Sequence, residues 1–318
     1  MTRFGYFLST EEYTPRELVE QAKLAEQAGF DALWISDHYH PWNDEQGQSP
    51  FVWSLIGAIS QVCSLPLTTA VTCPTVRIHP ALIAQAAATS SVLLGGKFVL
   101  GVGSGEALNE HILGDAWPSA DVRLQMLEES VALIRELWKG EDTDWDGDHY
   151  HVENARIYTR PHDQIPIYIS GFGPKAIQLA GRIGDGFIST KADAEQVKLF
   201  RDSGGGSKPA QGGVKVCWAP DEEQGVKTAH RLWANAGVPG ELSQVLPSPK
   251  HFEQVSELVT PDMTRESTVC GPDVDRHVGA LREYVDAGFD EVYVGQIGGE
   301  LEGFFGCYRD EVLPTLRG

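Results

Sequence analysis

One short segment of the sequence concentrates side chains that can exchange protons. Residues 36–42 read Ser-Asp-His-Tyr-His-Pro-Trp and follow an apolar run, so that Asp37, His38 and Trp42 lie close together. An imidazole titrates near neutrality and serves as a general base, and an adjacent carboxylate can raise its basicity or bind a ligand. A lone histidine is often only hydrogen-bonded within a core. The density of polar and aromatic groups favours a functional site here, with His38 at its centre.

The His-x-His spacing of His38 and His40 also fits part of a metal site. Such a site needs further ligands from later strands. The predicted ends of those strands carry Ser170-Gly171, Ser189-Thr190 and Gly295-Gln296, without histidine or aspartate. We therefore expect no metal.

A second polar segment spans residues 101–110, where three alternating glycines precede Glu106 and Asn109. The spacing matches neither the GxGxxG fingerprint nor a P-loop. The glycines would allow the backbone to approach a planar ligand, with Glu106 and Asn109 facing the same site. Taken alone, Glu106 is equally consistent with an ordinary solvated carboxylate.

A third segment, residues 170–176, reads Ser-Gly-Phe-Gly-Pro-Lys-Ala and predicts a turn into a helix that begins at Pro174. Free amides at the positive end of a helix are a suitable seat for a phosphodiester. An ordinary turn with proline at the helix start explains the same residues.

All three segments follow predicted strands. Apolar runs alternate with amphipathic helical stretches, the runs lying at residues 3–9, 32–36, 67–72, 98–102, 165–170, 186–189, 214–218 and 291–295. Eight strand-then-helix units in this length predict a (β/α)8 TIM barrel, with a doubly wound open sheet as the alternative. In a barrel, catalytic side chains gather at the carboxyl ends of the strands.

The whole chain, residues 1–318, is predicted to be a single barrel domain with two insertions. Residues 140–164 are rich in aspartate and predict a surface hairpin. Residues 237–270 carry several prolines and glycines and predict an elaborated loop over the barrel mouth, with one short helix near residues 251–259.

Composition narrows the class of partner. The 25 lysines and arginines face 45 aspartates and glutamates, a formal charge of −20, which disfavours nucleic acid and anionic membrane surfaces. The five cysteines are scattered without a CxxC pair, so we expect neither disulfides nor a zinc ribbon. Without a recognisable signal peptide or a membrane-length apolar segment, a cytoplasmic protein that acts on a small molecule is expected.

The sequence resembles the luciferase-like (β/α)8 oxidoreductases, and within them the dehydrogenases that use coenzyme F420, an 8-hydroxy-5-deazaflavin. It is most similar to those that oxidise glucose 6-phosphate. The resemblance rests on residues 35–42, 74–85, 101–110 and 181–188. It covers residues 3–190 well and the remainder loosely.

This resemblance implies specific roles for the polar residues. His38 would be the general base toward the substrate hydroxyl, Glu106 would supply a proton to the reduced cofactor, and Trp42 would help to hold the reacting species. A deazaflavin transfers hydride in two-electron steps, so the protein must supply both proton-handling groups. His38 and Glu106 come from different strands and are expected to lie on opposite sides of the ring.

Further residues are implied as cofactor contacts. The deazaflavin would be lined by Asp37, Ala70, Val71, Cys73, Ser104, Gly105 and Asn109, and its phosphodiester tail by Phe172, Gly173, Lys175 and Ala176. The resemblance also implies a cis peptide bond between Ala70 and Val71, behind the ring.

The expected substrate site departs from the pattern of the glucose-6-phosphate enzymes, which hold the phosphate with two lysines and an arginine. Only the arginine is matched, as Arg265; one lysine position falls near Ser243, and the other within residues 191–194, where Lys191 is displaced. Thr190, Lys191 and Arg265 are the candidate substrate contacts, although Lys191 is equally consistent with surface charge.

The resemblance therefore implies an F420-dependent sugar-6-phosphate dehydrogenase that forms a homodimer. The alternatives are an F420-dependent oxidoreductase acting on an unphosphorylated alcohol or carbonyl, and a noncatalytic F420-binding protein. A flavin monooxygenase is disfavoured by the resemblance alone.

Overall fold

Eight parallel strands form a closed barrel in the computed structural model, which describes residues 2–318. Neighbours pair in order around the ring, and β11 pairs back with β1. The strands are β1 (Arg3–Leu8), β2 (Leu33–Ile35), β3 (Leu67–Thr69), β4 (Phe98–Val102), β7 (Ile167–Ser170), β8 (Gly186–Ser189), β9 (Ala210–Cys217) and β11 (Glu291–Gln296). A two-residue strand, β10 (Val269–Cys270), adds to β9. The closure confirms the (β/α)8 barrel and rules out the open sheet.

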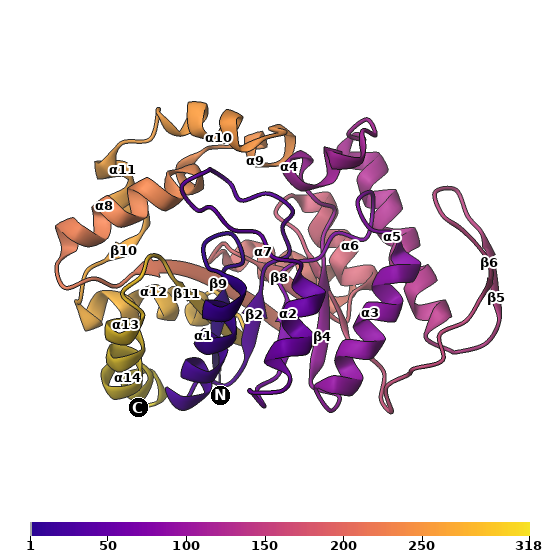
Figure 1. The fold of residues 1–318 in the computed structure, drawn as a ribbon, viewed down its shortest axis with the longest axis horizontal. Coiled ribbons are helices and arrows are strands. Elements are labelled where there is room, and N and C mark those ends of the chain that lie inside the picture. Colours follow the sequence, from indigo (N-terminus) through magenta and orange to yellow (C-terminus); the bar gives the residue numbers. More distant parts are fainter. Residues whose placement is uncertain (1) are drawn as a thin grey trace.

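Helices cover the outside of the barrel (Figure 1). They are α1 (Pro15–Gln27), α2 (Val52–Ile59), α3 (Pro80–Leu93), α5 (Ala120–Leu137), α6 (Pro174–Ile183), α7 (Ala194–Phe200), α8 (Glu222–Trp233), α12 (Val274–Asp286), α13 (Leu301–Cys307) and α14 (Leu313–Arg317). Local signals set their starts: at α1, Thr14 and Glu17 form a reciprocal capping box and Pro15 occupies the first turn. No helix within residues 2–318 is long and apolar enough to cross a membrane.

Large side chains fill the barrel interior. The Trp34 indole stacks on Tyr293 with ring centroids 4.4 Å apart, and its Nε1 donates to Gln211 Oε1 at 2.8 Å. Gly213 has no side chain because a Cβ there would lie 2.1 Å from the Trp34 ring. The barrel is therefore a packed core, and its chemistry is confined to the ends of the strands.

The two expected insertions have different structures. Residues 143–155 form an antiparallel hairpin of β5 (Thr143–Asp146) and β6 (His151–Ala155), which extends from the side of the barrel (Figure 1). The segment after α8 holds a 3-10 turn, η3 (Ala234–Gly237), and three helices, α9 (Leu242–Val245), α10 (Pro249–Ser256) and α11 (Pro261–Ser267).

The expectation of a loop with one short helix in this second segment is wrong in the number of helices. Proline stands at the first turn of α10 and of α11, so residues that signal loops in the sequence here start helices. Helices α8–α11 lie across the barrel end opposite the two termini, and α9 packs against α4 (Ala107–Glu110) (Figure 1).

Candidate active site

The loops after β1, β2 and β4 bring three ionisable side chains together at the mouth of the barrel. His38 Nε2 lies 3.5 Å from Glu11 Oε1 and 3.6 Å from Glu106 Oε1. The side chain of His38 is 10% exposed, that of Glu11 3% and that of Glu106 26%. An imidazole that takes up a proton at Nε2 would therefore face two carboxylates, one enclosed and one accessible.

Asn109 connects these groups. Its Nδ2 donates to Glu106 Oε1 at 2.8 Å and lies 3.1 Å from His38 Nδ1. Its Oδ1 accepts from the backbone amides of Tyr39 and His40 at 2.8 and 3.1 Å. One buried amide thus fixes the loop after β2 against the loop after β4, and the two candidate proton-transfer groups keep a fixed separation.

The expected arrangement of His38 and Glu106 on opposite sides of a ring is wrong. A flat ring in van der Waals contact with a group on each face needs about 7 Å between those groups. His38 Nε2 and Glu106 Oε1 are 3.6 Å apart, so both groups belong to one side of any ring bound against them.

Glu11 is a site residue that the sequence pattern did not single out. Ser36 Oγ donates to Glu11 Oε2 at 2.6 Å, which orients the carboxylate beneath His38. Burial acts to raise the pKa of Glu11, but the nearby His38 and Lys215 charges and the Ser36 hydroxyl bring it below its usual value. Glu11 is therefore ionised, and its position directly after β1 was the only available signal.

Asp37, a predicted cofactor contact, is 4% exposed and belongs to a second polar network. Its carboxylate accepts from Thr72 Oγ1 at 2.7 Å and from Arg77 Nη2 at 3.0 Å.

Arg77 also binds a second buried carboxyl group, that of Glu110. The backbone N–H of Arg77 donates to Glu110 Oε2 at 2.7 Å, and the Arg77 Nε donates to Glu110 Oε1 at 3.4 Å. Burial raises the pKa of Glu110 to about 7, although Arg77 acts in the opposite direction. Nothing in the sequence pattern assigns a role to Arg77 or Glu110.

Trp42 packs against His38 with ring centroids 5.1 Å apart. Its other neighbour is Phe252 of α10, at 5.0 Å and nearly perpendicular. Trp42 therefore connects the predicted base to the segment that crosses the barrel mouth.

The ends of β3, β4 and β7 form a narrow cradle beside this cluster. The peptide bond between Ala70 and Val71 is cis, as expected. A Cβ at Gly103 would lie 2.9 Å from Val71 Cγ2, and one at Gly105 would lie 2.5 Å from Cys73 Sγ. Gly105 also has a φ of +79°, which other residues rarely adopt. Ser104 lies between these two glycines, so the structure brings together the predicted ring contacts that follow β3 and β4.

The predicted tail site lies at the start of α6. The first helical bond runs from Ile177 N to Gly173 O at 3.1 Å, so the amides of Lys175 and Ala176 precede the helical ladder. Phe172 is 41% exposed. The Lys175 ammonium instead pairs with Asp121 of α5 at 2.6 Å, which leaves backbone amides as the anion-binding groups.

The three candidate substrate contacts do not join the His38 cluster. Thr190 is exposed, and Lys191 Nζ lies 5.9 Å from the Phe172 ring, on the side of the tail site.

Arg265 pairs with Glu222, Glu223 and Asp262. Glu222 begins α8 and Trp233 ends it, about 16 Å apart along the helix at 1.5 Å per residue. Trp233 is the end that reaches the mouth, where its Nε1 donates to Glu12 Oε2 at 2.7 Å. Arg265 is therefore held at the far end of α8 from the His38 cluster.

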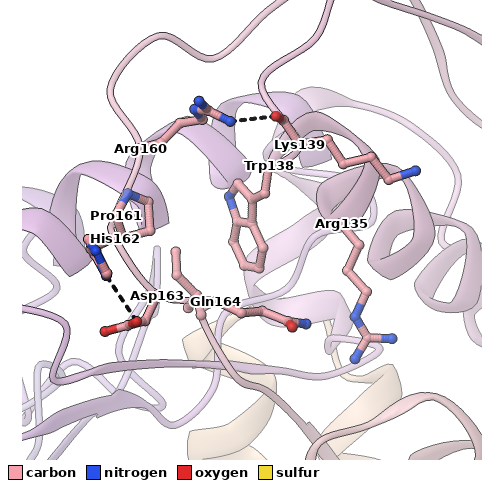
Figure 2. Close-up of a pocket in the computed structure, with 9 residues that line it drawn as sticks. Arg135, Trp138, Lys139, Arg160, Pro161, His162, Asp163 and Gln164 are labelled. Atoms are coloured by element: carbon pink, nitrogen blue, oxygen red, sulfur yellow. Dashed lines mark hydrogen bonds and ion pairs between the residues drawn. The ribbon is translucent and has the colours of Figure 1, made fainter.

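A surface pocket of about 430 Å³ lies elsewhere, between the end of α5 and residues 160–165 (Figure 2). Its wall includes the Trp138 indole, and the Arg160 guanidinium donates to the carbonyl of Lys139. None of the predicted site residues lines it. Within residues 2–318, no three histidine, cysteine, aspartate or glutamate side chains form a metal-binding group.

Comparison with known proteins agrees with the barrel fold. A family model described as luciferase-like monooxygenase matches residues 1–291. The chain belongs to the luciferase-like family. Among its relatives in this family, the F420-dependent glucose-6-phosphate dehydrogenase of Nakamurella multipartita is 37% identical and aligns over 99% of this chain and 96% of its own length. The protein of the same name from Microbacterium testaceum is 36% identical, over 99% and 97%.

Solved structures also match this chain over nearly its whole length. An F420-dependent secondary alcohol dehydrogenase in complex with an F420-acetone adduct has a TM-score of 0.92 and 31% identity, and covers 100% of this chain and 99% of its own. The coenzyme F420-dependent tetrahydromethanopterin reductase from Methanopyrus kandleri has a TM-score of 0.79 at 19% identity, with 99% of each chain covered, and shares the fold.

Proposed function

We propose that this chain is a coenzyme F420-dependent dehydrogenase that oxidises the anomeric hydroxyl of a sugar 6-phosphate, such as glucose 6-phosphate, to the lactone. The observation that carries the proposal is the convergence of His38, Glu11 and Glu106 beside the glycine cradle. Relatives of that name, aligned over nearly the whole chain, support it.

The residues at the mouth suit a flat, anionic cofactor. Gly103 and Gly105 let the loop after β4 pack closely against Val71 and Cys73, so that the backbone around Ser104 and the cis peptide at Val71 would form one wall for a flat ring. The free amides at the start of α6 would hold the phosphodiester. When bound there, the deazaflavin supplies a two-electron hydride acceptor.

His38 performs the first proton transfer. In the proposed reaction the imidazole starts with its N–H at Nδ1, which donates to the carbonyl of His40 at 3.2 Å and leaves the lone pair of Nε2 for the substrate. Nε2 takes the proton from the hydroxyl oxygen while hydride leaves the carbon that bears the hydroxyl, and the C–O bond becomes C=O, which balances the two-electron oxidation. The carboxylate of Glu11 then faces the imidazolium, and the Glu106 carboxyl lies on its accessible side.

Glu106 performs the second proton transfer. It is the accessible member of the cluster, and Asn109 Nδ2 holds its Oε1. Because Glu11 is enclosed, Glu106 is the carboxyl able to deliver a proton within the site and exchange it with solvent.

The proposal is tested by mixing the purified protein with F420 and glucose 6-phosphate and following the visible absorbance of the oxidised deazaflavin. Loss of absorbance that requires the sugar phosphate supports it. F420 binding without any loss of absorbance, on this or any other alcohol, would leave a noncatalytic F420-binding protein. FMN in place of F420 is the control for flavin chemistry.

A second candidate is an F420-dependent oxidoreductase for an unphosphorylated alcohol or carbonyl. The ion pairs of Arg265 with Glu222, Glu223 and Asp262 favour it, because they occupy the arginine expected to hold the phosphate. The secondary alcohol dehydrogenase of similar structure adds support. If Thr190, Lys191 and Arg265 hold the substrate phosphate, the variants R265A and K191A should each have a higher KM for glucose 6-phosphate. If both KM values are unchanged and the enzyme prefers a neutral alcohol, the second candidate is favoured.

A cytoplasmic homodimer with a role in carbohydrate metabolism completes the proposal. Free cysteines, four of them buried, suit a reducing compartment. Exposed apolar side chains on and beside α2 and α3, including Phe51, Leu82 and Leu93, offer a surface for a second copy. Sedimentation velocity would separate dimer from monomer.

A further inference from the structure

Lys215 is a part-buried cation for which the reaction outlined above has no use. It lies near the carboxyl end of β9 and extends into the barrel mouth. Its Nζ lies 4.3 Å from the centre of the Phe7 ring and 3.8 Å from that of Trp233, and it donates to Ser9 Oγ. Two aromatic faces thus enclose the ammonium and stabilise it by cation–π attraction.

The charged groups nearest to Lys215 along its contacts are two consecutive carboxylates from the loop after β1. Ser9, which accepts from Lys215, precedes Glu11 by two residues, and Trp233, which covers the ammonium, donates to Glu12. Burial lowers the pKa of Lys215, whereas these two carboxylates act to raise it. The carboxylate of Glu12 accepts from Trp233 Nε1 and from the backbone N–H of Gly298. Burial raises the pKa of Glu12, so a second buried negative charge is already costly at this position.

Glu11 is the link between Lys215 and the proposed base. After β2 it contacts Ser36 Oγ at 2.6 Å and His38 Nε2 at 3.5 Å. Lys215 donates to Ser9, two residues before Glu11, and from there its charge acts on the Glu11 carboxylate. Without the ammonium, Glu11 would lose an opposite charge while its neighbour Glu12 remained, and both circumstances favour the protonated form of Glu11. A protonated Glu11 would offer no negative charge to an imidazolium at His38.

We propose that Lys215 is a positioning residue for proton transfer, which keeps Glu11 ionised beside His38 Nε2 so that the imidazolium formed in the reaction has a counter-charge. The inference rests on the proposed function. It adds a residue of β9, across the barrel mouth from His38 and Glu106.

The test compares wild type, K215M, K215R and E11Q as full-length enzymes over pH 5.5 to 9, with the substrate that wild type oxidises. In K215M we expect kcat to fall about 10-fold or more near neutral pH, and the acid limb of the pH profile to move up by about one unit, because Glu11 must then ionise unaided. K215R should restore most of kcat, and the affinity for F420 should stay within about twofold in all variants.

A double-mutant cycle separates action through Glu11 from direct contact with substrate. If Lys215 acts through Glu11, adding K215M to E11Q should change kcat by less than about twofold. Losses that multiply, a rise in KM with unchanged kcat, or a fall in kcat that is equal at every pH would overturn the proposal. K208M is the matched control, because Lys208 Nζ donates to the carbonyl of Gly184 before β9 begins, away from the cluster.

A second readout needs no turnover. Carboxyl 13C NMR of glutamate-labelled protein, with E11Q to assign the signal, should show Glu11 titrating about one pH unit higher in K215M than in wild type. An unchanged Glu11 titration overturns the inference, whereas a shifted titration in a protein that oxidises no alcohol overturns the proposed function instead. K215Q replaces K215M in both experiments if the methionine variant does not fold.

Discussion

His38 can accept a proton at Nε2 only when its ring hydrogen is on Nδ1, and the surrounding residues decide this. The carbonyl of His40 accepts a hydrogen from Nδ1, whereas the amide of Asn109 could donate to the same atom. Because Asn109 Nδ2 also donates to Glu106 Oε1, the ionisation of Glu106 influences where that amide is held. The two proton-transfer groups are therefore coupled through one side chain.

Replacing His38 by alanine should lower kcat by about 10²- to 10⁴-fold, the usual contribution of a general base. Affinity for F420, followed by fluorescence titration, should change little, because Asp37 and the glycine cradle remain intact. H151A, on the exposed hairpin, is the control and should keep full activity. Equal losses of turnover and cofactor affinity in H38A would contradict the assignment.

Glu110 makes the stability of the protein depend on pH, and the substitution E110Q should remove this dependence. Burial raises its pKa to about 7 in the folded state, from 4.5 when unfolded, so the folded state binds more protons between these values. The free energy of unfolding should therefore fall as pH rises through this window, by up to about 3 kcal/mol from this group. Urea denaturation at pH 5 to 8 should show E110Q gaining stability relative to wild type as pH rises. Parallel curves would contradict the raised pKa.

At the scale of residues, the sequence pattern predicted the groups that follow strand ends within recognisable segments, such as His38, Glu106 and Asn109. Glu11 and Lys215 escaped notice because each is an ordinary charged residue until the closed barrel brings β1, β2 and β9 together. The placement of His38 and Glu106 on one side of the site also depends on the contact of Asn109 with both, which spacing alone does not reveal.

At the scale of elements, the loop after β4 is shaped by what surrounds it. Gly105 has a positive φ, and a Cβ there would approach Cys73 Sγ, Glu110 Cγ and Trp117 within 3.3 Å. The loop thus packs between the ring cradle and the buried Arg77–Glu110 network. Gly105 is needed both for its positive φ and because the neighbouring side chains leave no room for a Cβ.

Gly105→Ala should destabilise the protein by about 1–3 kcal/mol, because it forces a strained backbone conformation and a contact with Cys73. As the loop shifts, affinity for F420 should fall about 10-fold or more. Thermal unfolding and F420 titration measure the two effects. Gly57→Ala is the control, since nothing lies within 4 Å of its Cβ position in α2. Unchanged cofactor affinity in G105A would contradict the cradle.

The elements themselves were predictable to different degrees. Alternating apolar runs and amphipathic stretches predict the eight barrel strands because each strand is buried on both faces. The helix predicted near residues 251–259 overlaps α10, whereas α9 and α11 were missed because both are short, and α11 also begins at a proline. The contact of Trp42 with Phe252 of α10 holds this segment across the mouth. Such tertiary contacts leave little trace in local sequence.

At the scale of the whole molecule, the formal charge of −20 opposes the approach of an anionic substrate. Raising NaCl from 10 to 150 mM should therefore increase kcat/KM for a sugar phosphate by about twofold or more, since the Debye length falls from about 30 to 8 Å. An uncharged alcohol is the control and should show little change. A fall in kcat/KM for the phosphate over the same range would indicate that local cations dominate its capture.

The central claim is that hydride passes from the substrate carbon to a deazaflavin held beside His38. It is tested most directly with glucose 6-phosphate deuterated at C1, or with the equivalent alcohol if the substrate is unphosphorylated, followed by mass spectrometry of the reduced cofactor. We expect reduced F420 one mass unit heavier than with unlabelled substrate, and no label in the H38A reaction beyond its residual turnover. Reduced cofactor without deuterium would contradict direct transfer at this site.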